Sequence, residues 1–352
     1  MSTTIGQMPF RRLFHADWST AAKKRWVACA ARADCGWQIS LPRLVGDTRA
    51  FVDKLFAASS PVLVGFDFPI GLPETYGRLT GFADFLTALD SFGQGEWAEF
   101  FVVADTHQQI SRTRPFYPRA STAGSKHVHL LHGLGIDSID IDALRRQCER
   151  ASPSHKAACP LFWTLGGNQV GKAAISGWQE VITPSRRRGA QLWPFDGSLA
   201  ELSISGAPVL AETYPAEAYG HVGVAFSSKM SKRRQADRRA VMVGLFDWAR
   251  QRHVAFAEQL ATQVMDGFGP RADGEDPFDA LIGLLGMIEV VDGRRLERPS
   301  HRNRREDWEG WILGQAASGD RGHKFVYEQG DLVEVMPKNA GPPRPHARSP
   351  KA

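Results

Sequence analysis

Acidic residues stand where short apolar runs end, and further acids open a strongly apolar segment near residue 280. A carboxylate at the end of a buried strand costs free energy unless it is paired, hydrogen-bonded or bound to a cation. Several such residues converging predict a divalent-cation site, because Mg²⁺ and Mn²⁺ prefer oxygen ligands. The candidates are Asp17, Asp67, Glu212, Asp276 and Asp279.

We predict different roles for these five acidic residues. Asp17 and Asp67 are the core of the predicted site, although each could simply cap a turn. Glu212 is either a ligand or the partner of a nearby Arg or Lys. Asp276 and Asp279 share one face of a predicted helix, where acids also serve as dipole partners, and we favour Asp279 because a buried pattern follows it. We predict catalytic roles for Asp17, Asp67, Glu212 and Asp279, and metal ligation by Asp17, Asp67, Asp276 and Asp279.

The elements that must position these acids follow from hydrophobic patterning. Strands are expected at 13–17, 24–30, 36–41, 62–66 and 208–212, and helices after Asp47 and at 237–252, 256–265 and 277–291. This order predicts an α/β fold with a mixed sheet whose first strand lies beside the fourth. Asp17 and Asp67 would then meet at the carboxyl edge of the sheet, where ligands bind in such folds.

Four segments resemble a family of bacterial and archaeal proteins. The family is known as a domain of unknown function, number four hundred and twenty-nine, described as predicted RNase H-like nucleases. The segments that carry the resemblance are His15–Ser19, Gly65–Pro73, Glu212–Tyr219 and Asp276–Ala280.

The resemblance implies an RNase H-like mixed sheet of strand order 3-2-1-4-5, with flanking helices and a large insertion between strands 4 and 5. It also implies a divalent-metal site. Asp17 would be the first-strand ligand, Asp67 the fourth-strand ligand and Glu212 the fifth-strand acid, and Asp276 or Asp279 would come from the C-terminal helix.

The expected organisation has three parts. Residues 10–73 and 208–335 form the RNase H-like core. Residues 74–207 form an insertion that contributes to the site, with a helix near 82–89 and a strand at 100–103. Residues 336–352 form a disordered basic tail.

Two basic features are candidates for binding the phosphates of a substrate. The run from Gly166 to Lys172 matches the spacing of a P-loop, but the residue after Lys172 is Ala173 rather than the Ser or Thr that binds Mg²⁺. It is a P-loop, a simpler anion-binding loop or a structural turn. The second feature is a basic run that either contacts phosphates or is a solvated helix face. The predicted substrate-binding residues are Lys172, Asn168, Lys229, Arg233 and Arg234.

Composition restricts the class of protein. Of the formal charge of +5, four charges lie on Lys338, Arg344, Arg348 and Lys351, so the body is close to neutral and its basicity alone is weak support for nucleic-acid binding. The four cysteines form no CxxC pair, and the chain shows no apolar leader and no long apolar span. These features predict reduced thiols, a cytoplasmic location and no membrane partner.

The leading hypothesis is a nuclease that uses Mg²⁺ or Mn²⁺ to hydrolyse phosphodiester bonds, with nucleic acid as its partner. One alternative is a phosphotransferase or other small-molecule phosphate enzyme on the same scaffold. Another is a non-catalytic module that binds nucleic acid.

Overall fold

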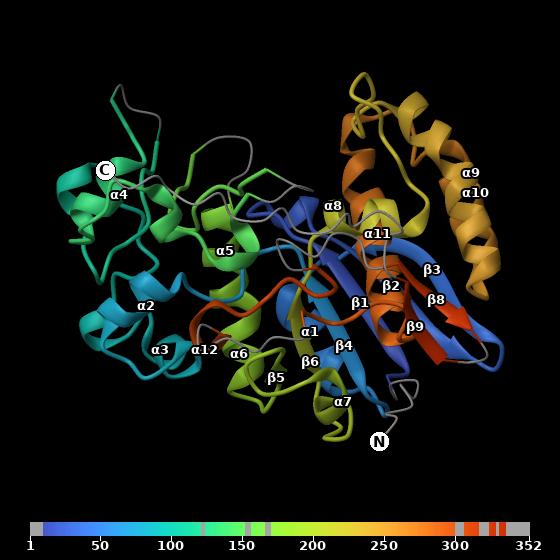
Figure 1. The fold of residues 1–352 in the computed structure, drawn as a ribbon, viewed down its shortest axis with the longest axis horizontal. Helices are drawn as coiled ribbons and strands as arrows, with labels where there is room; N and C mark the ends of the chain where they lie inside the picture. Colours follow the sequence, from blue (N-terminus) through green and yellow to red (C-terminus); the bar gives the residue numbers. More distant parts are fainter. Residues whose placement is uncertain are drawn as a thin grey trace, which may run out of the picture.

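A mixed sheet of seven strands organises the chain, with helices on both of its faces (Figure 1). The structure, a computed structural model, describes residues 10–120, 124–151, 156–165, 170–299 and 306–316, and the backbone at 324–328 and 331–335. The strands of the sheet are β1 (Arg12–Asp17), β2 (Trp26–Ala33), β3 (Gly36–Leu44), β4 (Val62–Phe66), β5 (Gln191–Leu192), β6 (Val209–Glu212) and β7 (Val254–Phe256). The predicted α/β class is therefore confirmed.

The strand order across the sheet is β5-β6-β4-β1-β2-β3-β7. β1 pairs antiparallel with β2 and parallel with β4, as predicted for the first and fourth strands, and β4 pairs parallel with β6. The predicted order of five strands differs from this sheet at both edges, which β5 and β7 occupy. β5 has two residues and β7 has three, and runs that short carry no measurable alternation.

Twelve α-helices are assigned in the part of the chain that the structure describes. They are α1 (Thr48–Phe56), α2 (Glu74–Thr80), α3 (Phe85–Ser91), α4 (Val128–Gly133), α5 (Val170–Gly177), α6 (Thr183–Arg186), α7 (Leu199–Leu202), α8 (Pro215–Ala218), α9 (Gln235–Gln251), α10 (Glu258–Asp266), α11 (Glu275–Val291) and α12 (Glu306–Glu309). Asp47 caps α1 as expected, since its carboxylate accepts a hydrogen bond from the Ala50 N–H at 2.7 Å.

Shorter helical turns connect these elements. The 3₁₀ turns are η1 (Ala22–Lys24), η2 (Gly95–Trp97), η3 (His107–Gln109), η4 (Ile141–Leu144), η5 (Gln147–Glu149), η7 (Tyr219–Val222) and η8 (Ala272–Gly274), and η6 (Trp178–Ile182) is a π-helical turn that joins α5 to α6.

The sheet separates two hydrophobic cores, because successive side chains of a strand point to opposite faces. In β1, Leu13 belongs to the core beneath α9, α10 and α11, whereas Phe14 belongs to the core shared with α1 and the segment between β4 and β5. Figure 1 shows α11 lying across β1 and β2, and the teal helices α2, α3 and α4 grouped beside the sheet. α11 thus brings its first turn over the carboxyl end of β1.

One prediction within 74–207 is wrong, that of a strand at 100–103. Residues 100–103 form a turn and not a strand; Phe100 is buried there and stacks on Phe92 at a ring-centroid distance of 3.6 Å. A short apolar run can fill an aromatic cluster as well as a sheet, and its periodicity does not distinguish the two. β5 also lies inside this segment, so part of the expected insertion is an edge of the sheet.

The C-terminal region departs from the expected core. β8 (Lys324–Glu328) and β9 (Asp331–Val335) form a separate two-stranded antiparallel sheet. The predicted tail, 336–352, lies outside the described residues. Among the helices that the structure describes, none combines the length and the apolar character needed to cross a bilayer.

Candidate functional site

Asp17 and Asp67 lie side by side at the carboxyl edge of the sheet. β1 and β4 are parallel neighbours in which Ala16 pairs with Phe66, so the next residue of each strand is at the same level. Both carboxylates point to the α11 face, because Leu13 and Leu63 face it and side chains alternate along a strand. The Asp67 carboxylate accepts a hydrogen bond from the Trp18 N–H at 2.6 Å, which fixes it against the end of β1.

Close packing of α11 on the sheet adds Asp279 to this pair. A Cβ placed on Gly283 would lie 2.1 Å from the Nε2 atom of His15, so only glycine allows the helix to approach β1 this closely. Asp279 is four residues before Gly283, on the same helix face, and Asp17 is two residues after His15, on the same strand face. The contact between Gly283 and His15 therefore sets Asp279 over Asp17.

Mutual repulsion and burial make this cluster of carboxylates electrostatically costly. Burial, with the charges of Asp67, Asp279 and Asp276, raises the pKa of Asp17 well above its ordinary value. Burial also raises the pKa of Asp67 to about 7, against the hydrogen bond from Trp18, and burial with the charge of Glu275 raises the pKa of Asp276 to about 6. Carboxylates placed in this way hold protons near neutral pH or bind a cation.

A lysine from a distant loop partly neutralises the cluster. The ammonium of Lys232 forms an ion pair with Asp279, and the hydroxyl of Tyr219 donates a hydrogen bond to the other oxygen of Asp279 at 2.5 Å. Buried Arg238 of α9 holds the lysine in place, since its guanidinium donates to the Lys232 carbonyl at 2.6 Å. Within the described residues, no group of three or more His, Cys, Asp or Glu side chains is arranged to hold a metal ion.

Glu212 lies at the end of β6 but faces a different set of partners. Arg146 donates to both oxygens of its carboxylate at 2.6 Å, and the Ile70 N–H donates to one of them at 2.6 Å. Glu212 is 4% exposed, so its oxygens are committed within the protein. Of the two roles open to Glu212, ligand or ion-pair partner, the structure places it in the ion pair.

Lys172 lies in the first turn of α5. Ser176, one helical turn further along α5, accepts a hydrogen bond from the Trp18 indole at 3.0 Å. Because residues four apart share a helix face, Lys172 belongs to the α5 face that meets the end of β1. Asn168 lies outside the described residues.

The basic run lies in the loop that leads into α9. Lys229, Arg233 and Arg234 are exposed; Arg234 pairs with Asp237 at 2.6 Å, and Arg233 lies 3.8 Å from Glu275. Lys232 in the same loop reaches Asp279, so the loop borders the carboxylate cluster at Lys232. Their role in binding a substrate stays a prediction.

A pocket of about 450 Å³ lies beside Asp276, the one member of the carboxylate cluster that lines it. Trp26, which pairs with Asp17 across the strands, lines this pocket together with Asp276. Its other walls are mostly apolar. The further charged residues that line it are Lys23, Lys24, Arg271 and Asp273, of which Arg271 and Asp273 form an ion pair with each other. We call this feature the Trp26 pocket. A flat apolar group next to a negatively charged group would fit it.

Three side chains that organise the site are not singled out by sequence reasoning. They are Tyr219, Arg146 and Lys232, the last being one of many cations in its run. Tyr219 ends the motif that begins at Glu212, so its spacing is a usable signal. The sequence carries no such signal for Arg146, because its contact with Glu212 spans 66 residues and leaves no local pattern.

The fold and site together define an α/β protein with a half-buried carboxylate cluster at the carboxyl edge of a mixed sheet. Comparisons of the chain with protein-family models, with curated proteins and with solved structures gave no match. The resemblance to the predicted RNase H-like nucleases therefore stays a prediction.

The raised pKa values predict how stability depends on pH in the metal-free protein. A carboxyl whose pKa is about 7 when folded and 3.8 when unfolded binds more protons in the folded state between these values. The contribution of Asp67 to the free energy of unfolding is thus fully present below about pH 4 and is lost as pH rises through about 7. Urea unfolding in EDTA between pH 5 and 8 should show this loss, and Asp67→Asn should reduce it. An equal loss in the variant would show that Asp67 does not titrate in this range.

Proposed function

We propose that this chain is a divalent-metal-dependent phosphodiesterase that acts on nucleic acid. The observation that carries the proposal is the convergence of Asp17, Asp67 and Asp279 from β1, β4 and α11, with pKa values of Asp17 and Asp67 raised by burial and by neighbouring carboxylates. A protein that keeps such repulsion at one edge of its sheet gains free energy when a cation binds there.

We further propose an RNase H-like core for the fold. The neighbouring strands β3-β2-β1-β4-β6 support it. β1, β2 and β3 pair antiparallel in succession, and β4 and β6 run parallel to β1. On this proposal β5 and β7 extend the sheet, and most of 74–207 is an insertion. α5 and η6 of that segment contact residues that adjoin the site, since the Trp18 indole bonds to Ser176, and Glu180 pairs with buried Arg25 at 2.5 Å.

The donor set fits Mg²⁺ or Mn²⁺. Asp17 and Asp67 offer carboxylate oxygens without an ion pair to any described residue, and Asp279 would join them once Lys232 moves away from it. A bound cation would lower the pKa of a water molecule and stabilise charge on the leaving oxygen.

The chain's own residues supply the other functions. The Trp18 N–H orients Asp67, and Tyr219 orients Asp279. Lys232, released from Asp279, would pair with a phosphate oxygen of the substrate. Asp276, with a pKa of about 6, is suited to accept or donate a proton near neutral pH. The Trp26 pocket would hold the base or sugar next to the scissile phosphate.

A direct assay tests this proposal. We expect the purified full chain to cleave a fluorescently labelled oligonucleotide when Mn²⁺ or Mg²⁺ is added, and to lose this activity in EDTA. Single- and double-stranded DNA and RNA substrates would identify the preferred class. Absence of cleavage of all four substrates with either cation would contradict a nuclease.

A small-molecule phosphotransferase is the alternative that the Gly166–Lys172 spacing motivates. A P-loop needs a strand of the parallel sheet directly before its glycines. The described residues 161–165 precede that loop as a turn and an isolated bridge from Trp163 to Tyr117, not as a sheet strand. This context favours the phosphodiesterase over the phosphotransferase.

A further inference from the structure

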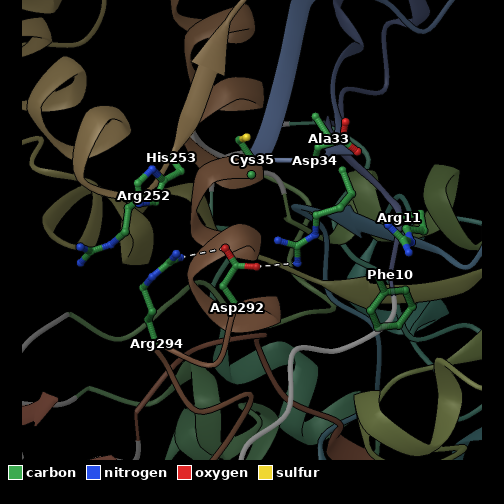
Figure 2. A pocket seen from close by; sticks show the side chains of 11 residues that line it. Phe10, Arg11, Ala33, Asp34, Cys35, Arg252, His253, Asp292 and Arg294 are labelled. Carbon is green, nitrogen blue, oxygen red and sulfur yellow. Dashed lines mark hydrogen bonds and ion pairs between the residues drawn. The ribbon is translucent and has the colours of Figure 1, made fainter. Parts of the chain in front are cut away.

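A second pocket, of about 740 Å³, lies at the other end of α11 from the carboxylates (Figure 2). From Asp276 to Asp292 the helix axis advances about 24 Å, at 1.5 Å per residue. Pockets of several hundred Å³ hold small molecules. The charged side chains that line this one are Arg11, Arg32, Asp34, Arg252, Asp292 and Arg294. We call it the arginine pocket.

Asp292 fixes two of these arginines. Its carboxylate is 3% exposed and accepts hydrogen bonds from Arg32 at 2.7 Å and from Arg294 at 2.9 Å. The Trp37 indole donates to the same carboxylate at 3.2 Å, and the Arg32 guanidinium lies 4.0 Å above the Trp37 ring. A guanidinium has five N–H donors in a rigid fork, so both arginines keep donors for a ligand.

Two more arginines flank this centre. In Figure 2, Arg252 and Arg11 lie on opposite sides of Asp292. Arg252 is held by buried Glu289 at 2.9 Å, whereas Arg11 is exposed and its guanidinium has no hydrogen bond or ion pair with any described residue. Four arginines therefore face three acids, Asp34, Asp292 and Glu289, which leaves an excess of one positive charge.

The wall of the arginine pocket is rigid. A Cβ on Gly36 would lie 1.9 Å from the carbonyl oxygen of His253, and that oxygen accepts a hydrogen bond from the Trp37 N–H at 3.1 Å. The turn between β2 and β3 is thus held in direct backbone contact with the turn between α9 and β7. A pocket that is ordered in advance of binding loses less entropy when a ligand enters.

We propose that the arginine pocket binds a small molecule that carries a phosphate or pyrophosphate group. Guanidinium groups held from several directions match the several oxygens of a phosphate, with which arginine forms bidentate hydrogen bonds. The excess of positive charge selects an anion. This site is separate from the carboxylate cluster and does not depend on the proposed nuclease activity.

Cys35 provides a direct probe, because it lines the arginine pocket and is the exposed thiol among the four free cysteines. Burial raises the pKa of the Cys29 and Cys148 thiols, and that of Cys159 to about 11, so these react slowly with alkylating reagents. We expect pyrophosphate to slow the alkylation of Cys35 by iodoacetamide in a saturable manner, with a matching isotherm by calorimetry.

A matched pair of variants locates the binding. Arg11→Glu should weaken pyrophosphate binding by about tenfold or more, the effect of losing a charge-assisted hydrogen bond, and should leave the fold intact because the Arg11 guanidinium has no described partner to lose. Arg12→Glu changes the neighbouring exposed residue, which does not line the pocket, and should bind as wild type does.

Three results would overturn the proposal. They are no protection of Cys35 by millimolar pyrophosphate, equal binding by Arg11→Glu and wild type, and protection by a single-stranded oligonucleotide but not by pyrophosphate. The last result would mean that the arginine pocket contacts the backbone of a nucleic acid instead of a free phosphate compound.

Discussion

Replacing Asp67 with Asn is expected to abolish metal-dependent cleavage while the protein remains folded. The substitution removes one anionic ligand of the proposed cation, and loss of several kcal/mol of transition-state stabilisation lowers the rate on the order of 10³-fold. The Asn side-chain oxygen can still accept the hydrogen bond from the Trp18 N–H, so the end of β1 stays in place. We expect the same loss of activity from Asp17→Asn.

Stability should change in the opposite direction to activity. The pKa of Asp67 is raised to about 7, chiefly by burial, with the charge of Asp279 adding to the effect. Asn at this position removes that unfavourable charge, so the metal-free variant should be at least as stable as wild type at pH 8, as measured by urea unfolding. A variant that is inactive and yet more stable marks a residue selected for function and not for folding.

Cation binding can be measured without the activity assay. Titration of Mn²⁺ followed by electron paramagnetic resonance reports free Mn²⁺, and we expect saturable binding in wild type that is lost in Asp67→Asn. Asp90 is an exposed carboxylate of α3, so Asp90→Asn is the matched control. This variant should bind Mn²⁺ and cleave the oligonucleotide as wild type does. Full cleavage activity in both Asp17→Asn and Asp67→Asn would remove the carboxylate cluster from the mechanism.

The parts of the site that could be predicted from the sequence are those set by local pattern. Asp17 and Asp67 end two short apolar runs, and the order of elements alone predicts that these runs are neighbouring strands, as β1 and β4 are. Asp279 could be chosen from the apolar helix that follows it, which is α11. Local signals of this kind reach as far as one strand or one helix.

The remainder depends on contacts between distant segments. Glu212 follows the same strand-end pattern as Asp67, yet Arg146, from a segment with no regular pattern, takes up its carboxylate. Lys232 is one cation in a dense basic run, and its contact with Asp279 depends on the fold of its loop, which Arg238 holds through the Lys232 carbonyl. The edge strands β5 and β7 escape prediction because each is too short to show alternation.

Arg146→Met is expected to destabilise the protein by about 3–5 kcal/mol, the cost of leaving buried carboxylates without their partner. Arg146 is fully buried and pairs with Glu212 at 2.6 Å and with Glu149 at 2.9 Å. It also donates to the carbonyl oxygens of Ile70 and Glu309, so it ties η5 to the end of β4 and to α12. Arg119→Met is the control, because Arg119 and Asp105 form a half-exposed pair worth at most about 1 kcal/mol.

The pH dependence of the stability lost in Arg146→Met distinguishes the loss of the ion pairs from the loss of side-chain packing. Burial already raises the pKa of Glu212, and Arg146 opposes that rise. Without Arg146 the carboxyl takes up a proton more readily in the folded state, so the deficit of Arg146→Met should shrink as pH falls from 8 to 5. A deficit that is equal at both pH values would assign the loss to packing.

Glu212→Gln completes the comparison, since it tests whether the fifth-strand acid has any share in cation binding. Both oxygens of Glu212 are occupied by Arg146, and one also accepts the Ile70 N–H. We therefore expect Glu212→Gln to lower the free energy of unfolding and to leave the Mn²⁺ isotherm unchanged. A weakened isotherm in a folded Glu212→Gln variant would return Glu212 to the ligand set, and the cation would then lie nearer to β6 than the pair formed by Asp17 and Asp67.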